Sequence, residues 1–247
     1  GRFVGVDFHC NCLRDSKGET ISIILCWRIP QKTHQFICIS VINLIQIIMT
    51  SKDLSIYISD FFSYAYGQKI ELYNEYSLQH ELGIFLRNKC PNYSVQFERN
   101  TNFFGIKTAT VKQEIDIAVF DKNEKFAIEL KFPRDGAYPR RMFQFVEDIC
   151  FIEQLKLNGF TGGCAVSLVD DMNFCTNQGL ITKGIYSYFR DGNSIQGVIS
   201  NPMTKGPKQL TIKNSYNAIW NSTNFWDRDE VADPIKSVLA KYYIIEI

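Results

Sequence analysis

"QEIDIAVFDKNEKFAIELKF" (residues 113–132) alternates apolar and polar residues on both sides of a short polar break. Alternation with a period of two predicts β-strands that bury one face. The break at residues 121–124 predicts a hairpin turn with Lys122 and Asn123 at its centre, where asparagine tolerates the positive φ that such turns require. We therefore expect two adjacent antiparallel strands joined by this turn.

This turn fixes which residues face each other across the hairpin. It places Asp116 opposite Glu129 and Glu114 opposite Lys131, on the same face as Ala118 and Ala127. The small alanines predict that another element packs closely over this face. The opposite face is expected to be core and consists of Ile115, Ile117, Val119, Phe126, Ile128, Leu130 and Phe132.

Two carboxylates opposite each other destabilise a hairpin, because their Cβ atoms lie only ~5 Å apart. One interpretation is a half-solvated amphipathic hairpin. The other is that Asp116 and Glu129 hold Mg²⁺, a hard cation that prefers oxygen ligands. Without a cation, the pKa of one of the two carboxyls should be raised. Lys131 then lies where an ammonium can bind a phosphate oxygen or orient water, and Glu114 either tethers it or forms a simple salt bridge with it.

The flanking sequence supplies further elements. Apolar spacing predicts a helix over residues 74–90 that ends at Pro91, and a second helix over 138–158. Alternation predicts strands over 93–100 and 103–111, and a strand leading into a turn over 184–193. Further strands are expected at residues 163–169, 195–200, 209–214 and 241–247. The order of helix, three strands, helix and strand predicts an α/β fold with a mixed central sheet flanked by helices.

Composition narrows the class of protein. The chain has 247 residues and a net charge of +1, so any contact with nucleic acid must come from a local basic patch. Eight cysteines without a repeating framework predict reduced thiols and a cytoplasmic protein. His9, Cys10 and Cys12 lack a second pair at zinc-finger spacing, so structural zinc is not expected.

The chain is expected to divide near residue 48. Residues 36–49 form an apolar run of 14, shorter than the ~20 residues of a membrane helix. Met49 and the residues after it resemble the start of an ordinary protein. Residues 1–48 are therefore expected to be either an upstream fragment without a role or an N-terminal extension packed on the domain. Residues 49–247 are expected to form one domain, with its core at about 74–170 and a sheet extension at 171–247.

Asp116, followed thirteen positions later by Glu129-Leu130-Lys131 and preceded by a helix that carries a glutamate, resembles the PD-(D/E)xK nuclease superfamily and its restriction-endonuclease-like fold. The resemblance covers about residues 74–170. It departs from the motif at Ile115, which stands where the name of the motif places proline. It implies that Asp116 and Glu129 bind the metal, that Lys131 is catalytic, and that a helix glutamate completes the metal site. Glu81 is the first choice for that glutamate, and Glu75 is the alternative.

The function implied is Mg²⁺-dependent hydrolysis of phosphodiester bonds in nucleic acid, with DNA as the first choice of substrate. Mn²⁺ is expected to be able to replace Mg²⁺. The biological role is left open between restriction, other defence, and repair or recombination. A homodimer is also left open, and no membrane partner is expected. A basic patch follows the lysine and consists of Arg134, Arg140 and Arg141, whose guanidinium groups suit phosphate. The alternatives are a non-catalytic nucleic-acid-binding module on the same fold and an unrelated α/β protein-interaction domain.

Overall fold

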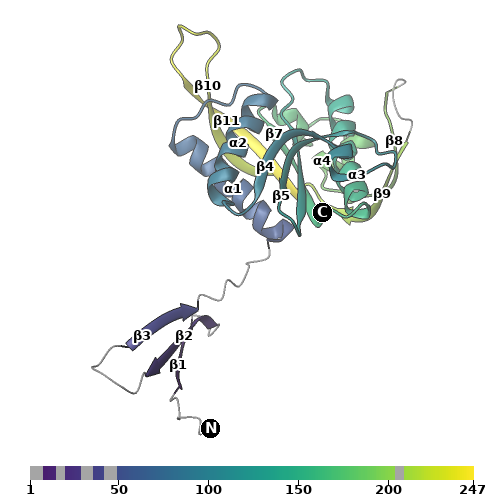
Figure 1. Cartoon of the computed structure of the whole chain (residues 1–247). Coiled ribbons are helices and arrows are strands. Elements are labelled where there is room, and N and C mark those ends of the chain that lie inside the picture. The colour runs from purple at the N-terminus through teal and green to yellow at the C-terminus, as the bar shows by residue number, and fades with distance from the viewer. Residues whose placement is uncertain (1–7, 15–19, 29–35, 42–48, 204–208) are drawn as a thin grey trace. The chain divides into compact units, whose positions relative to one another are not determined.

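The computed structural model describes residues 8–14, 20–28, 36–41, 49–203 and 209–247 (Figure 1). It divides into two compact units, Gly1–Ile48 and Met49–Ile247. In the first unit, β1 (Phe8–Arg14), β2 (Thr20–Arg28) and β3 (Phe36–Val41) form an antiparallel sheet in that order. The side chains of His9, Cys10 and Cys12 lie outside the described part of this unit. No helix in the described ranges has the length and apolar character needed to cross a membrane.

The second unit is a mixed α/β domain. Its helices and strands are α1 (Ser51–Gly67), α2 (Glu75–Lys89), β4 (Ser94–Asn100), η1 (Thr101–Phe104), β5 (Glu114–Phe120), β6 (Lys125–Lys131), α3 (Tyr138–Leu157), β7 (Gly162–Val169), η2 (Met172–Phe174), α4 (Ile185–Arg190), β8 (Ile195–Ser200), β9 (Gln209–Tyr216), β10 (Asn221–Asp227) and β11 (Lys236–Glu246). From α2 to β7, the expected order of helix, three strands, helix and strand is confirmed.

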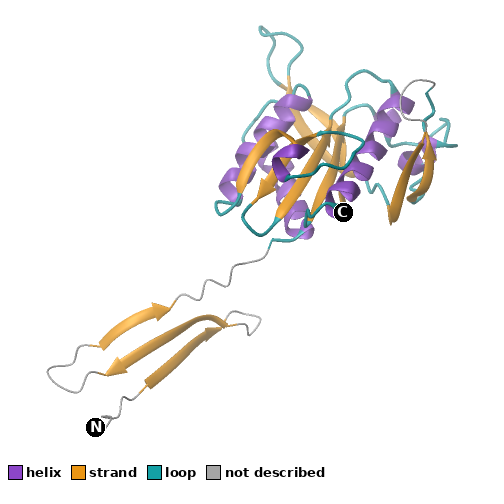
Figure 2. Cartoon of the chain, turned by 45° about the vertical axis from the view of Figure 1, so that its right-hand side comes forward, coloured by secondary structure: helices purple, strands orange, loops and turns teal. Residues whose placement is uncertain are grey.

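Six strands form one sheet in the order β10-β11-β7-β6-β5-β4. β6 and β7 are parallel and the other neighbours are antiparallel, so the sheet is mixed, as expected. α3 is the crossover between the two parallel strands, and β7 is buried along its whole length. Figure 2 shows helices on both faces of this sheet. The separate β8–β9 hairpin lies against α3, on the side of the helix away from the sheet.

The predicted register of the hairpin is confirmed, since Ile117 pairs with Ile128 and Ala118 with Ala127. The positive φ expected for Asn123 in the turn is wrong. Asn123 does not have positive φ, and the non-glycine residues described with positive φ are Lys69 and Glu98. Instead, the Asp121 carboxylate accepts hydrogen bonds from the main-chain N–H groups of Asn123 and Glu124, both at 2.7 Å. A side chain of the loop therefore stabilises a turn that needs no left-handed residue.

Each face of the sheet has its own core. α1 and α2 cover the face that carries Ile117, Ile128 and Leu130. α3 covers the face of Ala118 and Ala127, as the two small side chains predicted. Ile115 is the exception, because it packs in the α3 core rather than with its expected neighbours.

Two expected strands are absent. Of residues 103–111, the first two belong to η1, and the rest have no regular structure although all are described. Residues 185–190 form the short helix α4 instead of a strand, because Ile185 and Phe189, four residues apart, both turn into the α3 core.

Candidate functional site

The polar face of the hairpin brings Asp116 and Glu129 together where the β5–β6 ladder ends. Beyond the Ile117–Ile128 pair, side chains replace the ladder hydrogen bonds. The Asp116 carboxylate accepts from the Leu130 N–H at 2.7 Å, and the Glu129 carboxylate accepts from the Asp116 N–H at 3.3 Å. Each acid is thus fixed by the backbone of the opposite strand. The expected meeting of these two carboxylates is present.

Lys131 lies on the same face, at the carboxyl end of β6, with its side chain 11% exposed. Its ammonium lies 3.4 Å from Glu75, 3.5 Å from Asp148 and 3.8 Å from Asp116. The partner expected for it, Glu114, is instead exposed and faces Asn100 of β4. The two strands separate before this position, so the predicted Glu114–Lys131 pair is wrong.

The helix glutamate at the site is Glu75 rather than Glu81. Asn74 caps α2, and Glu75 is the first helical residue. Its carboxylate accepts from the Phe132 N–H at 3.1 Å as well as contacting Lys131. Glu81 lies six residues further on, about 240° around the helix, and its carboxylate faces His80 at 3.8 Å. The alternative that the sequence left open is the one that the fold places at the site.

α2 also contributes Gln79, one turn after Glu75 on the same side of the helix. Its side-chain amide donates to the Asp116 carbonyl at 2.7 Å and to the Glu98 carboxylate. Gln79 is buried, and it links α2 to β5 at Asp116. The amide therefore helps to fix the position of Asp116 relative to the helix that carries Glu75.

Two charged residues of the site were not anticipated from the sequence. Asp148, on the side of α3 that faces the sheet, is 2% exposed. Lys112, in the irregular segment before β5, places its ammonium between Glu129 and Asp148, at 2.9 Å from the latter. A charged residue within the apolar face of a helix was the available signal for Asp148. No pattern marked Lys112, because its neighbours become close only in the folded chain.

Glu129 has no exposed surface, and its pKa is shifted by burial and by the neighbouring charges. Burial raises the pKa of Glu129 well above its ordinary value, and repulsion from Asp116 raises it further. The expected rise in the pKa of one of the two carboxyls is present, with burial as its larger cause and repulsion from the facing acid as the second. For Lys112 and Lys131, burial opposes the charge, but attraction to Asp148 and the other acids outweighs it and raises both pKa values. Both lysines are therefore ammonium ions within an acidic cluster.

The three arginines expected to contact phosphate are all engaged with acids. Arg134 contacts Asp227 at 2.8 Å and Asp170 at 3.3 Å. Arg140 and Arg141 both contact Asp135, at 2.8 and 2.7 Å. The hydrogen bond from Arg141 and the charges of both arginines lower the pKa of the Asp135 carboxyl to about 2. Arg140 is the most exposed of the three, with 53% of its side chain accessible.

The acids and lysines form one cluster at the carboxyl end of β6. Its members are Glu75, Lys112, Asp116, Glu129, Lys131 and Asp148. In the described part of the chain, no three His, Cys, Asp or Glu side chains are arranged to hold a metal ion. Comparisons of this chain with protein-family models, curated proteins and solved structures find no match.

Proposed function

We propose that the domain Met49–Ile247 is a divalent-cation-dependent nuclease that hydrolyses phosphodiester bonds, with DNA as its preferred substrate. The observation that carries the proposal is the meeting of Asp116, Glu129 and Lys131 with Glu75 of the preceding helix. The two strands and the helix supply these groups in the order that the PD-(D/E)xK resemblance implies. Burying Glu129 beside Asp116 costs stability, which supports a functional role for the pair.

The chemistry of the cluster fits a hard divalent cation. Its donors are carboxylate oxygens, and Mg²⁺ commonly uses one or two carboxylates with water and a substrate phosphate as its remaining ligands. Four carboxylates face two ammonium groups, which leaves the cluster negative when all are ionised. Asp116 and Glu129 would hold the cation. A bound divalent cation supplies a water of lowered pKa and stabilises charge on a phosphoryl oxygen.

Lys131 is suited to act on the substrate. Its ammonium is largely buried yet remains close to Asp116, so it is held at the edge of the acidic cluster. From there it can bind a non-bridging phosphate oxygen and stabilise the charge that develops there. Glu75 fixes the position of this ammonium and of the backbone at Phe132.

Nucleic acid would approach past α2 and the start of α3. Arg140 and Arg141 can exchange Asp135 for a phosphate, since this ion pair lies at the surface. Arg134 is less suited, because Asp170 and Asp227 both hold it. Tyr73 and Tyr76, which are 60% and 73% exposed on either side of Glu75, offer aromatic faces on which bases can stack.

The test is a cleavage assay with the purified chain of residues 1–247. Labelled plasmid, linear duplex, single-stranded DNA and RNA are each incubated with Mg²⁺, Mn²⁺ or chelator. We expect cleavage of at least one substrate with metal, none with chelator, and a loss of about 100-fold or more in Lys131→Ala. Lys122→Ala, in the exposed hairpin turn, is the matched control and should keep full activity. Cleavage that persists in Lys131→Ala would show that the site is misassigned or the activity belongs to a contaminant.

A second candidate is a non-catalytic nucleic-acid-binding module. It is favoured by one observation, namely that Lys112 and Lys131 already pair with the acids of the cluster. This function predicts binding to labelled duplex or single strands by fluorescence anisotropy in chelator, with no cleavage under any metal condition. Binding that requires metal and leads to cleavage would exclude it.

A further inference from the structure

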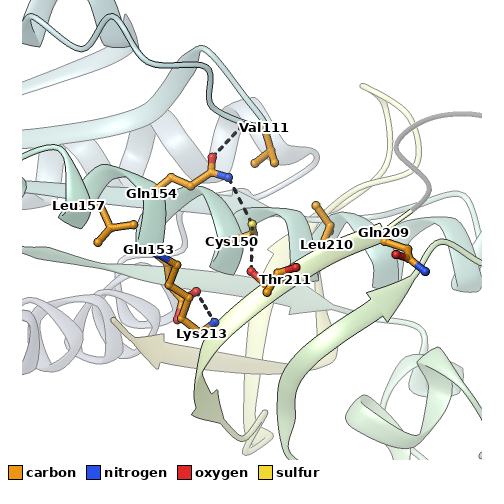
Figure 3. Close-up of a pocket in the computed structure, with 9 residues that line it drawn as sticks. All are labelled: Val111, Cys150, Glu153, Gln154, Leu157, Gln209, Leu210, Thr211 and Lys213. Carbon is orange, nitrogen blue, oxygen red and sulfur yellow. Dashed lines mark hydrogen bonds between the residues drawn. The ribbon is translucent and has the colours of Figure 1, made fainter.

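Residues 105–113, here called the strap, connect η1 to β5 and lie along one side of α3. The Thr108 hydroxyl donates to the Asn158 side chain at 2.9 Å. The Val111 N–H donates to the Gln154 side chain at 2.8 Å (Figure 3). Val111 borders a cavity of about 340 Å³ that lies between α3 and β9. Ile106 anchors the start of the strap in the α3 core. Between Ile106 and Lys112 the strap is held to α3 and its C-cap by individual polar contacts, and open space lies beside Val111.

The strap ends by inserting Lys112 into the acidic cluster. The Lys112 ammonium contacts Glu129 of β6 and Asp148 of α3, and it lies 5.7 Å from the centre of the Phe151 ring. Its side chain is 26% exposed, whereas those of Glu129 and Asp148 are 0% and 4% exposed. Two buried acids from different elements thus converge on one cation that reaches them from a surface segment.

The position of this ammonium has the properties of a cation site. Two carboxylates that share one positive centre are a usual contribution of a protein to a Mg²⁺ site, with water completing the shell. Oxygen ligands lie ~2.0–2.1 Å from Mg²⁺, whereas the Lys112 nitrogen is 2.9 Å from Asp148. Asp148 would thus need to approach a metal ion at this position by less than about 1 Å.

We propose that Glu129 and Asp148 form a divalent-cation site that the Lys112 ammonium fills, and that Mg²⁺ or Mn²⁺ binds there by displacing Lys112 and its strap. This deepens the proposed function, on which it rests, by adding Asp148 as a ligand and Lys112 as an internal competitor of the metal. Displacement also releases the ammonium at the edge of the site, where a substrate phosphate is its natural new partner.

The experiment measures metal binding to the chain of residues 1–247 by calorimetry with Mn²⁺ and Mg²⁺, without nucleic acid. Lys112→Met keeps the apolar stem and removes the competing charge. We expect it to bind Mn²⁺ about tenfold more tightly than the unsubstituted protein. In chelator it should have a lower Tm, because Glu129 and Asp148 lose their cation, and Mn²⁺ should restore the Tm. Lys107→Met, at an exposed position of the same strap, is the matched control and should change neither quantity.

Two further variants keep the test decisive if Lys112→Met fails to fold. Gln154→Ala leaves every charge in place but frees Val111, so it should tighten Mn²⁺ binding as well, by a smaller factor. Asp148→Asn should weaken it. Unchanged or weaker binding in the Lys112 and Gln154 variants would overturn the inference. Competitive metal binding in a protein that cleaves no substrate would instead support the inference and overturn the nuclease proposal, so the two failures are distinguishable.

Discussion

Replacing Glu75 and Glu81 in turn, each by alanine, tests which glutamate of α2 belongs to the site. The Glu75 carboxylate accepts a hydrogen bond from the Phe132 N–H at 3.1 Å and lies at the amino terminus of α2. A hydrogen bond to a charged group contributes ~1.5–3 kcal/mol, but 40% exposure of this side chain reduces that value. A negative charge in the first helical turn adds ~0.3–1 kcal/mol. We expect Glu75→Ala to lower the free energy of unfolding by about 1–2 kcal/mol.

Glu81 provides the matched control on the same helix. It is partly exposed, and its partner in the structure is His80 at 3.8 Å. Alanine is the stronger helix former, so Glu81→Ala should change the free energy of unfolding by less than about 0.5 kcal/mol. For a domain of this size, 1 kcal/mol shifts the Tm by ~2–4 °C. Thermal denaturation in chelator should therefore separate the two variants by several degrees.

The same pair separates a structural role of Glu75 from a functional one. If the nuclease proposal holds, Glu75→Ala should also reduce metal-dependent cleavage by about 100-fold, because the position of Lys131 is no longer fixed. Glu81→Ala should cleave at close to the normal rate. Loss of cleavage in Glu81→Ala with normal activity in Glu75→Ala would refute the site as described here.

Two further predictions concern packing and pH. In Gly163→Ala the new Cβ would collide with the main-chain oxygen of Ala127. Urea titration should therefore show a free energy of unfolding lower by ~1–3 kcal/mol. Gly67→Ala is the control and should be neutral, because a Cβ there meets no atom within 4 Å. Burial raises the pKa of the Cys150 thiol to about 11. As the pH rises, the thiol ionises in the unfolded chain before it does in the folded one. Between pH 9 and 11 the free energy of unfolding should therefore fall by up to ~1.4 kcal/mol per pH unit. Cys150→Ala should reduce this slope, and an unchanged slope would contradict the raised pKa of Cys150.

The alternation of residues 113–132 was sufficient to predict the hairpin and its register. A one-residue slip of either strand would turn its charged residues toward the isoleucines of the α1–α2 core, so the pattern admits one solution. The alternation of residues 103–111 carried less information. Its polar atoms find partners on α3 and its C-cap instead of on a strand, since Val111 bonds to Gln154 and Thr108 to the cap residue Asn158. Alternation thus predicts a strand only where a neighbouring strand is available.

The charged cluster was predictable only in part, for the same reason. Asp116, Glu129 and Lys131 lie on one hairpin, whose local geometry the sequence determines. Glu75 and Asp148 arrive from helices whose rotation depends on the packing of whole faces. The edge of an apolar face left both Glu75 and Glu81 as candidates, and the cap at Asn74 decides between them by setting where the helix starts. Helix rotation is a tertiary property that residue spacing constrains without fixing.

The cost of burying this cluster bears on its purpose. A buried ion pair is often no more stable than well-packed apolar residues of similar volume, and removing one partner costs ~3–5 kcal/mol. The domain nevertheless buries Glu129 and Asp148 against Lys112 and Lys131, with Asp116 close enough to raise the pKa of Glu129. Stability alone does not explain an arrangement in which like charges are this close. The proposed exchange of the Lys112 ammonium for a divalent cation would explain it, because such a site needs its acids in place beforehand and an occupant that can leave.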